Sequence, residues 1–179
     1  RSAAQRYRGA LLGLACGDAV GVAAEGLVPG RFAPLTDLRG GGPHHLLPGQ
    51  WTGCTSLAMC LAESLVARPR FDPLDQMNRY RDWWFCGYWS ARPDSFGIGP
   101  TTEAALTRFE STGDPWCGID APVPAGNGAL VRAAPVAMRY QPSLPLLQHH
   151  AAASARTTHA APLAAASSAG EIVTVLRKS

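Results

Sequence analysis

Three short stretches of this sequence place glycine and hydroxyl or amide side chains directly before a helix-forming segment. They are residues 49–56 (GQWTGCTS), 97–102 (GIGPTT) and 126–129 (GNGA). Free backbone N–H groups and the positive end of the helix dipole make a helix start favourable for an anion such as phosphate. The hydroxyls of the first stretch could also serve a metal cluster. Each stretch alone is a weak signal, but together they favour a phosphate-bearing small molecule as ligand.

Histidine and cysteine are not spaced as in common metal sites. His44 and His45 are adjacent, as are His149 and His150, and neither pair has the i,i+4 spacing that places two rings on one ion. The five cysteines form no CxxC pair and indicate reduced thiols in the cytoplasm rather than a disulfide framework. One alternative for Cys54 is a nucleophile activated by a helix dipole, with His159 nearby; the other is a small core thiol.

Helices are the elements that must position these residues. The expected ranges are 4–22, 55–67, 73–89, 100–112, 127–140, 144–156 and 162–178. Asp72 before Pro73 is a typical start signal, whereas Asn127 is expected to cap a helix that Pro135 bends. No run shows sustained period-two alternation, so we expect an all-α protein without a sheet.

The spacing of small and apolar residues predicts which helix faces are buried. Four glycines share one face of the first helix and each costs about 1 kcal/mol relative to alanine, so we expect another backbone to pack closely there. These are Gly9, Gly13, Gly17 and Gly21. The inner face of 55–67 is predicted as Leu57, Cys60, Leu61, Ser64 and Leu65. That of 73–89 is predicted as Leu74, Met77, Tyr80, Trp84 and Tyr88.

Length and composition indicate one domain over residues 1–179, with a long loop at about 26–51. Apolar residues make up 46% of the chain and charged residues 16%, which excludes a disordered, highly charged protein. The net charge of +3 and the scattered basic residues exclude an extended nucleic-acid interface. No apolar run reaches membrane-spanning length, and no charged-then-apolar stretch followed by a small-residue cleavage site is present, so we expect neither a membrane span nor a leader within the sequence. Because the first residue is Arg1, we expect a trimmed start.

Five segments, in their order and spacing, resemble the N-terminal portion of the ADP-ribosylglycohydrolases, which include the enzymes that release ADP-ribose from dinitrogenase reductase. They are residues 6–26, 49–65, 96–106, 126–140 and 154–164, and they cover nearly the whole chain. The resemblance implies a compact multi-helix, all-α fold. It also implies hydrolysis of ADP-ribose from modified proteins or small molecules, by water held at a binuclear magnesium or manganese centre.

The resemblance assigns roles to individual residues. Glu25 matches the glutamate after the first helix and is the catalytic candidate, although by itself it would be taken as a surface carboxylate. Asp18 matches an aspartate expected to brace a loop by hydrogen bonds. The candidate ligand-binding residues lie in three matched segments. They are Gly97, Gly99, Gly126, Asn127, Gly128, Thr158 and His159, of which His159 alone would otherwise be taken as a structural histidine.

The same resemblance shows where this chain departs from the family. Family members usually read Thr-Asp-Asp-Thr, whereas this chain has Thr52, Gly53, Cys54 and Thr55 at the metal positions. An aspartate is also usual where Gly97 stands. Mg²⁺ requires oxygen ligands, and a glycine and a thiol do not replace two carboxylates. We therefore expect no divalent ion here, or a weakly bound one. A later aspartate-rich segment is absent before Ser179, so we expect the fold to be truncated at its C-terminus.

Three functions follow as hypotheses: an active ADP-ribosylglycohydrolase, a catalytically impaired relative that binds ADP-ribose or serves as an interaction module, and a site completed by another chain or by a missing part. The absent carboxylates favour the second for the chain as written. The expected partners are an ADP-ribose-like small molecule or an ADP-ribosylated protein. If later helices normally cover this half, the apolar faces of 144–156 and 162–178 are exposed and favour homo-oligomers.

Overall fold

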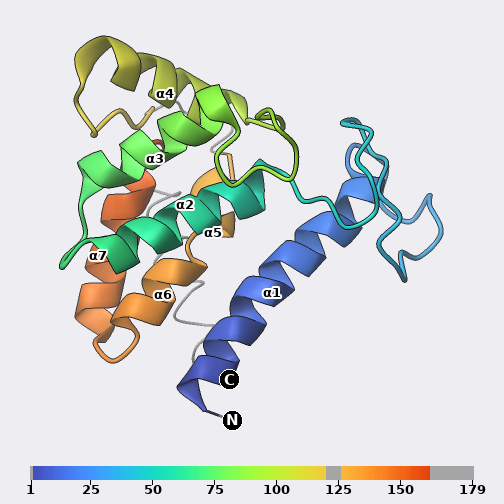
Figure 1. Ribbon diagram of the computed structural model, residues 1–179, viewed down its shortest axis with the longest axis horizontal. Coiled ribbons are helices and arrows are strands. Elements are labelled where there is room, and N and C mark those ends of the chain that lie inside the picture. The colour runs from blue at the N-terminus through green and yellow to red at the C-terminus, as the bar shows by residue number, and fades with distance from the viewer. Residues whose placement is uncertain (1, 120–125, 162–179) are drawn as a thin grey trace.

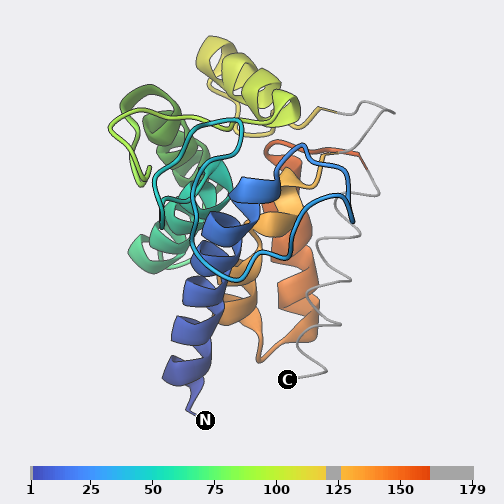
Figure 2. The same cartoon turned by 90° about the vertical axis from the view of Figure 1, so that its right-hand side faces the viewer.

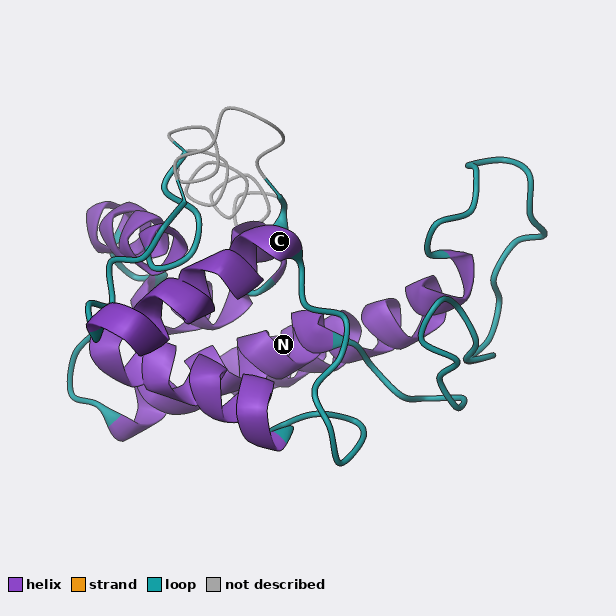
Figure 3. Ribbon diagram, turned by 90° about the horizontal axis from the view of Figure 1, so that it is seen from above, coloured by secondary structure: helices purple, strands orange, loops and turns teal. Residues whose placement is uncertain are grey.

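The computed structural model describes residues 2–119 and 126–161, and within these ranges the chain is helical with no strand (Figures 1 and 3). Only two isolated bridges occur there, Gly41 with Leu46 and Ile119 with His159. The helices are α1 (Ala3–Gly21), η1 (Val22–Ala24), α2 (Gly53–Ala67), α3 (Pro73–Cys86), α4 (Pro100–Thr112), α5 (Gly128–Val131), α6 (Ala134–Tyr140) and α7 (Leu144–Arg156). The predicted all-α class is confirmed. The helix predicted at 162–178 lies outside the described residues.

Local capping explains several helix ends. Asp72 accepts hydrogen bonds from the N–H groups of Leu74 and Asp75, as the sequence predicts for the start of α3. Gly87 and Gly113 end α3 and α4 with φ of 65° and 69°, a left-handed conformation that glycine adopts without strain. Because Gly87 ends α3, the helix predicted to reach residue 89 stops at Cys86.

The core surrounds α2, which packs against α3, α6 and α5 (Figure 1). The predicted inner face of α2 is confirmed, since all five of its residues are buried. The face predicted for α3 is partly wrong. Met77 and Tyr80 are buried, but Gln76 and Trp83 complete that face, while Leu74 is 47% exposed and Tyr88 lies beyond the helix.

Helix α1 is largely exposed although it contacts α2 and α6 (Figures 1 and 2). Ala19 is its one buried residue. A Cβ atom added at any of the four glycines on its predicted packing face would have no described atom within 4 Å. The expected close backbone contact is therefore absent from the described part of the chain, because no described segment lies over this face.

Two further expectations are corrected by the helices near the end of the described chain. The segment predicted as one bent helix from Asn127 to Tyr140 forms two helices, α5 and α6, separated at Arg132 and Ala133. Pro135 has no N–H to donate to the carbonyl of Val131, which interrupts the ladder. The apolar face of α7 is covered by α6, α3 and α5, with Leu147 and Ala151 buried, so it is not the exposed face we expected.

No helix in the described ranges is both long enough and apolar enough to cross a bilayer.

Candidate functional site

The start of α2 is held by the carboxylate of Asp18 from α1. The N–H groups of Thr52 and Thr55 donate to Asp18 Oδ2 over 2.9 and 3.2 Å. The Thr52 hydroxyl donates to Oδ1 over 2.8 Å, and the Thr55 hydroxyl to Oδ2 over 2.7 Å. The bracing role predicted for Asp18 is confirmed. These donors were expected to face an external anion, but the protein's own carboxylate occupies them.

Two positions at which the resemblance leads us to expect aspartate, Gly53 and Gly97, lie next to each other. A Cβ atom at Gly97 would lie 3.8 Å from the backbone nitrogen of Gly53. A Cβ atom at Gly53 would lie 2.8 Å from Cζ2 of the buried Trp83 and 3.3 Å from the Gly97 carbonyl oxygen. A side chain at position 53 therefore requires the indole ring to move.

The expected catalytic residue, Glu25, lies at the same end of the molecule. Its Oε2 is 3.9 Å from Nε2 of His44, and the same nitrogen is 3.3 Å from the position of a Cβ atom at Gly97. The side chains of Glu25 and His44 are 49% and 26% exposed, so both are open to solvent. The structure thus brings Glu25, Gly97 and Gly53 together and adds His44, which the sequence did not single out for this site.

Cys54 is not set up as a nucleophile. Burial raises the pKa of its thiol, and the nearby carboxylates of Asp18 and Glu25 raise it further. The opposing effects of the Thr52 hydroxyl and the Arg132 guanidinium are too small to reverse this. The alternative in which a helix dipole activates Cys54 is therefore not supported, because desolvation and nearby negative charge raise the pKa of the thiol rather than lower it.

The described residues do not fit the magnesium or manganese centre that the family implies. They contain no group of three or more His, Cys, Asp or Glu side chains arranged to hold a metal ion. Asp18 uses both carboxylate oxygens to accept from Thr52 and Thr55, and Gly53 supplies no side chain. The Cys54 thiol is a soft donor, whereas Mg²⁺ selects hard oxygen ligands.

A second part of the site joins the 126–128 loop to His159. The imidazole Nε2 lies 3.4 Å from the position of a Cβ atom at Gly126 and 3.3 Å from that of one at Gly128. Two hydroxyls in the first turn of α4 border the same loop. The Thr101 hydroxyl oxygen lies 3.7 Å from the position of a Cβ atom at Gly126, and that of Thr102 lies 3.4 Å from the position of one at Gly128. The N-cap of α4, Gly99, provides no side-chain cap. This helix start therefore lies beside the loop and the histidine, as an anion site requires.

Behind the loop, a buried guanidinium connects α5 to the end of α7. Arg132 Nη1 donates to the Gly128 carbonyl over 3.3 Å, and Nη2 donates to the Thr158 hydroxyl. The Thr158 oxygen lies 2.8 Å from His159 Nδ1. Burial, and then the charge of Arg132, lower the pKa of His159 to about 4, so this histidine is neutral at pH 7.

The remaining candidates have simple positions. Asn127 is exposed, and its side chain makes no capping bond; its backbone carbonyl accepts from Leu130 and Val131 instead. Gly99 has no described atom within 4 Å of a Cβ position. Sequence reasoning missed Arg132 and His44. An arginine within the apolar run ALVRAAPV was the one available signal, while nothing local distinguished His44 from His45.

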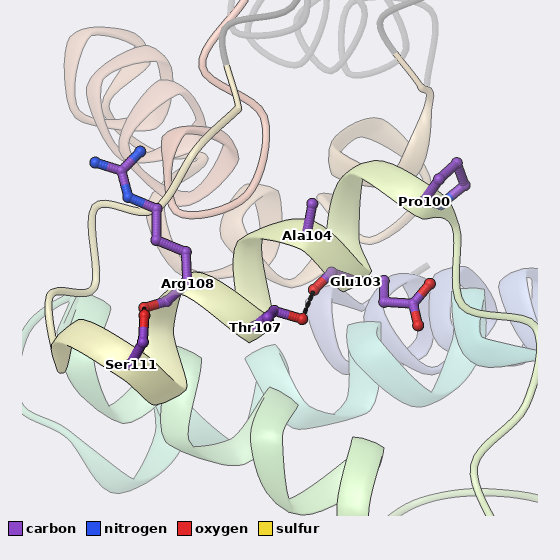
Figure 4. Close-up of a pocket in the computed structure, with 6 residues that line it drawn as sticks. All are labelled: Pro100, Glu103, Ala104, Thr107, Arg108 and Ser111. Carbon is purple, nitrogen blue, oxygen red and sulfur yellow. Dashed lines mark hydrogen bonds between the residues drawn. The ribbon is translucent and has the colours of Figure 1, made fainter.

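A surface hollow on the outer face of α4 is separate from these groups (Figure 4). It is lined by exposed residues, Pro100, Glu103, Ala104, Thr107, Arg108 and Ser111. The Thr107 hydroxyl donates to the Glu103 carbonyl over 2.9 Å, a bond within the helix. Thr102 and Leu106, which face the protein, are buried on the other side of α4. The hollow therefore does not belong to the candidate site.

Comparison with known proteins identifies the family. The family model described as ADP-ribosylglycohydrolase matches residues 1–177. The chain belongs to the ADP-ribosylglycohydrolase family. A solved structure, described as an ADP-ribosylglycohydrolase-related protein complex, is similar with a TM-score of 0.79 and 44% sequence identity; the match covers 93% of this chain and 53% of that one.

Two curated relatives of this ADP-ribosylglycohydrolase-family chain are informative. It is 39% identical to ADP-ribosylarginine hydrolase Tri1 of Serratia proteamaculans, over 90% of this chain and 44% of the relative. It is 33% identical to the ADP-ribosyl-[dinitrogen reductase] glycohydrolase of Rhodospirillum rubrum, over 88% of this chain and 52% of the relative. The chain therefore spans about half the length of these curated relatives.

Proposed function

We propose that this chain binds ADP-ribose without a divalent ion, and that by itself it does not catalyse the metal-dependent hydrolysis of its family. Gly53 and Cys54 stand where the resemblance to the family implies two aspartates, and this departure carries the proposal. The nearest bracing carboxylate, Asp18, is already used by Thr52 and Thr55. A doubly charged ion is therefore left without the negative oxygens that would compensate for its dehydration.

The ligand-facing groups support retention of ADP-ribose binding. The 126–128 loop, the start of α4 and His159 lie together, with Arg132 behind them. Neutral donors and a helix N-terminus suit the diphosphate of ADP-ribose, which is anionic and rich in acceptors. Free ADP-ribose and an ADP-ribosylated protein present the same diphosphate. The proposed compartment is the reducing cytoplasm, which is supported by five cysteines that are all free.

A second candidate is an active hydrolase whose metal site is completed by chain outside these residues. The observation that favours it is the half-length match to an ADP-ribosylarginine hydrolase. On this alternative, Glu25 would remain available to assist proton transfer, because half of its side chain faces solvent beside His44. EDTA-sensitive hydrolysis by a longer chain that contains these residues, with none by the present chain alone, would distinguish it.

Calorimetric titration tests the proposal. ADP-ribose is titrated into the chain in EDTA and again with excess Mg²⁺, and Mg²⁺ is titrated alone. We expect ADP-ribose to bind in EDTA, with Mg²⁺ changing the Kd by less than about twofold and no heat from the ion itself. A Gly128→Val variant should abolish binding, because its side chain would press on His159. An Ala67→Val variant, at an exposed position in the last turn of α2, is the control.

Two outcomes would overturn the proposal. Tight Mg²⁺ binding, or ADP-ribose binding that requires the ion, would show that the metal function survives. Absence of ADP-ribose binding under both conditions would leave only a structural or interaction role. An assay for release of ADP-ribose from an ADP-ribosylated arginine peptide, with and without EDTA, decides directly whether this chain retains activity.

A further inference from the structure

Arg132 is the most unusual charged residue of the described chain, because it is fully buried and has no acidic partner there within ion-pair distance. Its guanidinium lies over the ring of Tyr80, 4.9 Å from the centroid. Its Nε has no hydrogen-bond partner among the residues that the structure describes. Burying a cation costs free energy unless its N–H groups donate hydrogen bonds. The hydrogen bonds that Arg132 makes therefore indicate its structural role.

Those contacts lead to both sides of the candidate ligand site. Nη1 donates to the carbonyl of Gly128 in the loop, and Nη2 donates to the hydroxyl of Thr158 and, over 3.4 Å, to the carbonyl of Ser154. Thr158 is followed by His159, whose backbone N–H donates to the Ala155 carbonyl over 2.8 Å. One side chain therefore fixes the distance between the glycine loop and the histidine.

The hydrogen bonds also select one tautomer of His159. The guanidinium can only donate, so the Thr158 oxygen accepts from Arg132. The hydroxyl hydrogen of the fully buried Thr158 then needs an acceptor, and the partner at hand is His159 Nδ1, 2.8 Å away. A nitrogen that accepts carries no hydrogen, so in the neutral ring the hydrogen is on Nε2.

We propose that Arg132 and Thr158 are positioning residues that hold His159 as the Nε2–H tautomer and place this donor against the 126–128 loop. The donor then faces the space bordered by Gly126, Gly128 and Thr102. It offers one hydrogen bond to a phosphate or ribose oxygen, while the fixed charge of Arg132 lies behind it. The role in ligand binding rests on the proposed ADP-ribose function; the tautomer itself does not.

Nitrogen NMR of the free protein tests the tautomer without any ligand. In ¹⁵N-histidine-labelled protein at neutral pH, we expect His159 Nε2 to give a pyrrole-type signal and Nδ1 a pyridine-type signal. Thr158→Val removes the hydroxyl at nearly constant volume and should shift the ring toward a mixture of tautomers. Thr158→Ser keeps the hydroxyl and should restore the wild-type pattern. A ring that is Nδ1–H in the wild type overturns the proposal, even if the valine variant does not fold.

Titration with ADP-ribose tests the consequence for binding. We expect Thr158→Val to weaken binding about tenfold and Thr158→Ser to stay within about twofold of wild type. Equal affinity of all three proteins would contradict the positioning role. If none of the three binds ADP-ribose, the proposed function fails, whereas the NMR result still decides the tautomer. The two failures are therefore distinguishable.

Discussion

His159 carries a proton-linked contribution to stability that follows from its environment. It is 2% exposed, and burial together with the charge of Arg132 lowers its pKa to about 4. In the unfolded chain a histidine titrates near pH 6.5. Between these two values the unfolded state binds a proton that the folded state does not, so acid favours unfolding over this range.

The first prediction is therefore a specific pH dependence. The contribution of His159 is fully present above about pH 6.5 and is lost toward pH 4, at up to about 1.4 kcal/mol per pH unit. His150, whose pKa is lowered by burial and then by His149, adds a loss of the same sign. We expect the free energy of unfolding, measured with urea at each pH, to fall less steeply with decreasing pH for His159→Gln than for wild type. The exposed His45→Asn is the control, and equal slopes for all three proteins would contradict the prediction.

Which site residues were predictable from sequence depended on how local their signals are. Glu25, His159 and the 126–128 glycines could be named because they occur in short segments that resemble the family. Arg132 and His44 could not, because most of the partners that place them in the site are distant in sequence, Gly128 for Arg132 being the exception. Arg132 reaches Thr158, and His44 reaches Glu25 and Gly97. Nothing in the neighbouring residues encodes such contacts.

At the scale of elements, the junction between α1 and α2 depends on a single carboxylate. Asp18 accepts from two backbone N–H groups and two hydroxyls at the start of α2. A charged acceptor at this end of a helix is favoured by the dipole as well as by the hydrogen bonds. Because α1 has one buried residue, this junction is a large part of what attaches it to the remaining helices.

The second prediction concerns this junction. Asp18→Asn replaces one acceptor oxygen by an NH₂ donor that faces other donors. We expect it to reduce the free energy of unfolding by about 2 kcal/mol, since hydrogen bonds to a charged group are lost. Asp37→Asn is the matched control, because Asp37 is exposed and its one acceptor bond within the described residues is from the adjacent Leu38 N–H. Denaturant midpoints at constant m-value measure both, and an equal effect of the two substitutions would exclude the bracing role as a source of stability.

Helix ends were predictable where a short-range signal controls them. Asp72 with Pro73 starts α3, and Gly113 ends α4, as expected. The position of the break between α5 and α6 was not predictable. Pro135 indicates that the helix is interrupted, but it does not determine which of the preceding residues lose the helical conformation. The buried face of α3 shifted to Gln76 and Trp83 because its packing partners, rather than its own periodicity, select the face.

At the scale of the whole molecule, α1 presents an open surface beside a compact group of helices (Figure 2). Leu12 on this helix is 64% exposed, and the glycines next to it would meet no described atom within 4 Å if they carried a Cβ atom. The sequence indicated that the glycine face is a packing surface, but it could not indicate with what. An exposed leucine flanked by small residues on a helix face is suited to association.

The third prediction is that the chain self-associates through α1. Sedimentation velocity should show a mass that increases with protein concentration, and Leu12→Gln should shift the distribution toward monomer. Val66→Gln, at an 87% exposed position near the end of α2, is the control that should leave it unchanged. A monomer at every concentration in the micromolar range would show that this face does not bring copies of the chain together.

The buried indole of Trp83 provides an intrinsic fluorescence probe of the structure. Of the five tryptophans, it alone is completely shielded from water, and its Nε1 has no hydrogen-bond partner in the described chain. An indole in such apolar surroundings emits at shorter wavelength than exposed ones. The edge of its ring lies next to Gly53. Small displacements at the start of α2 should therefore change the emission maximum and the fluorescence intensity of Trp83, with no extrinsic label.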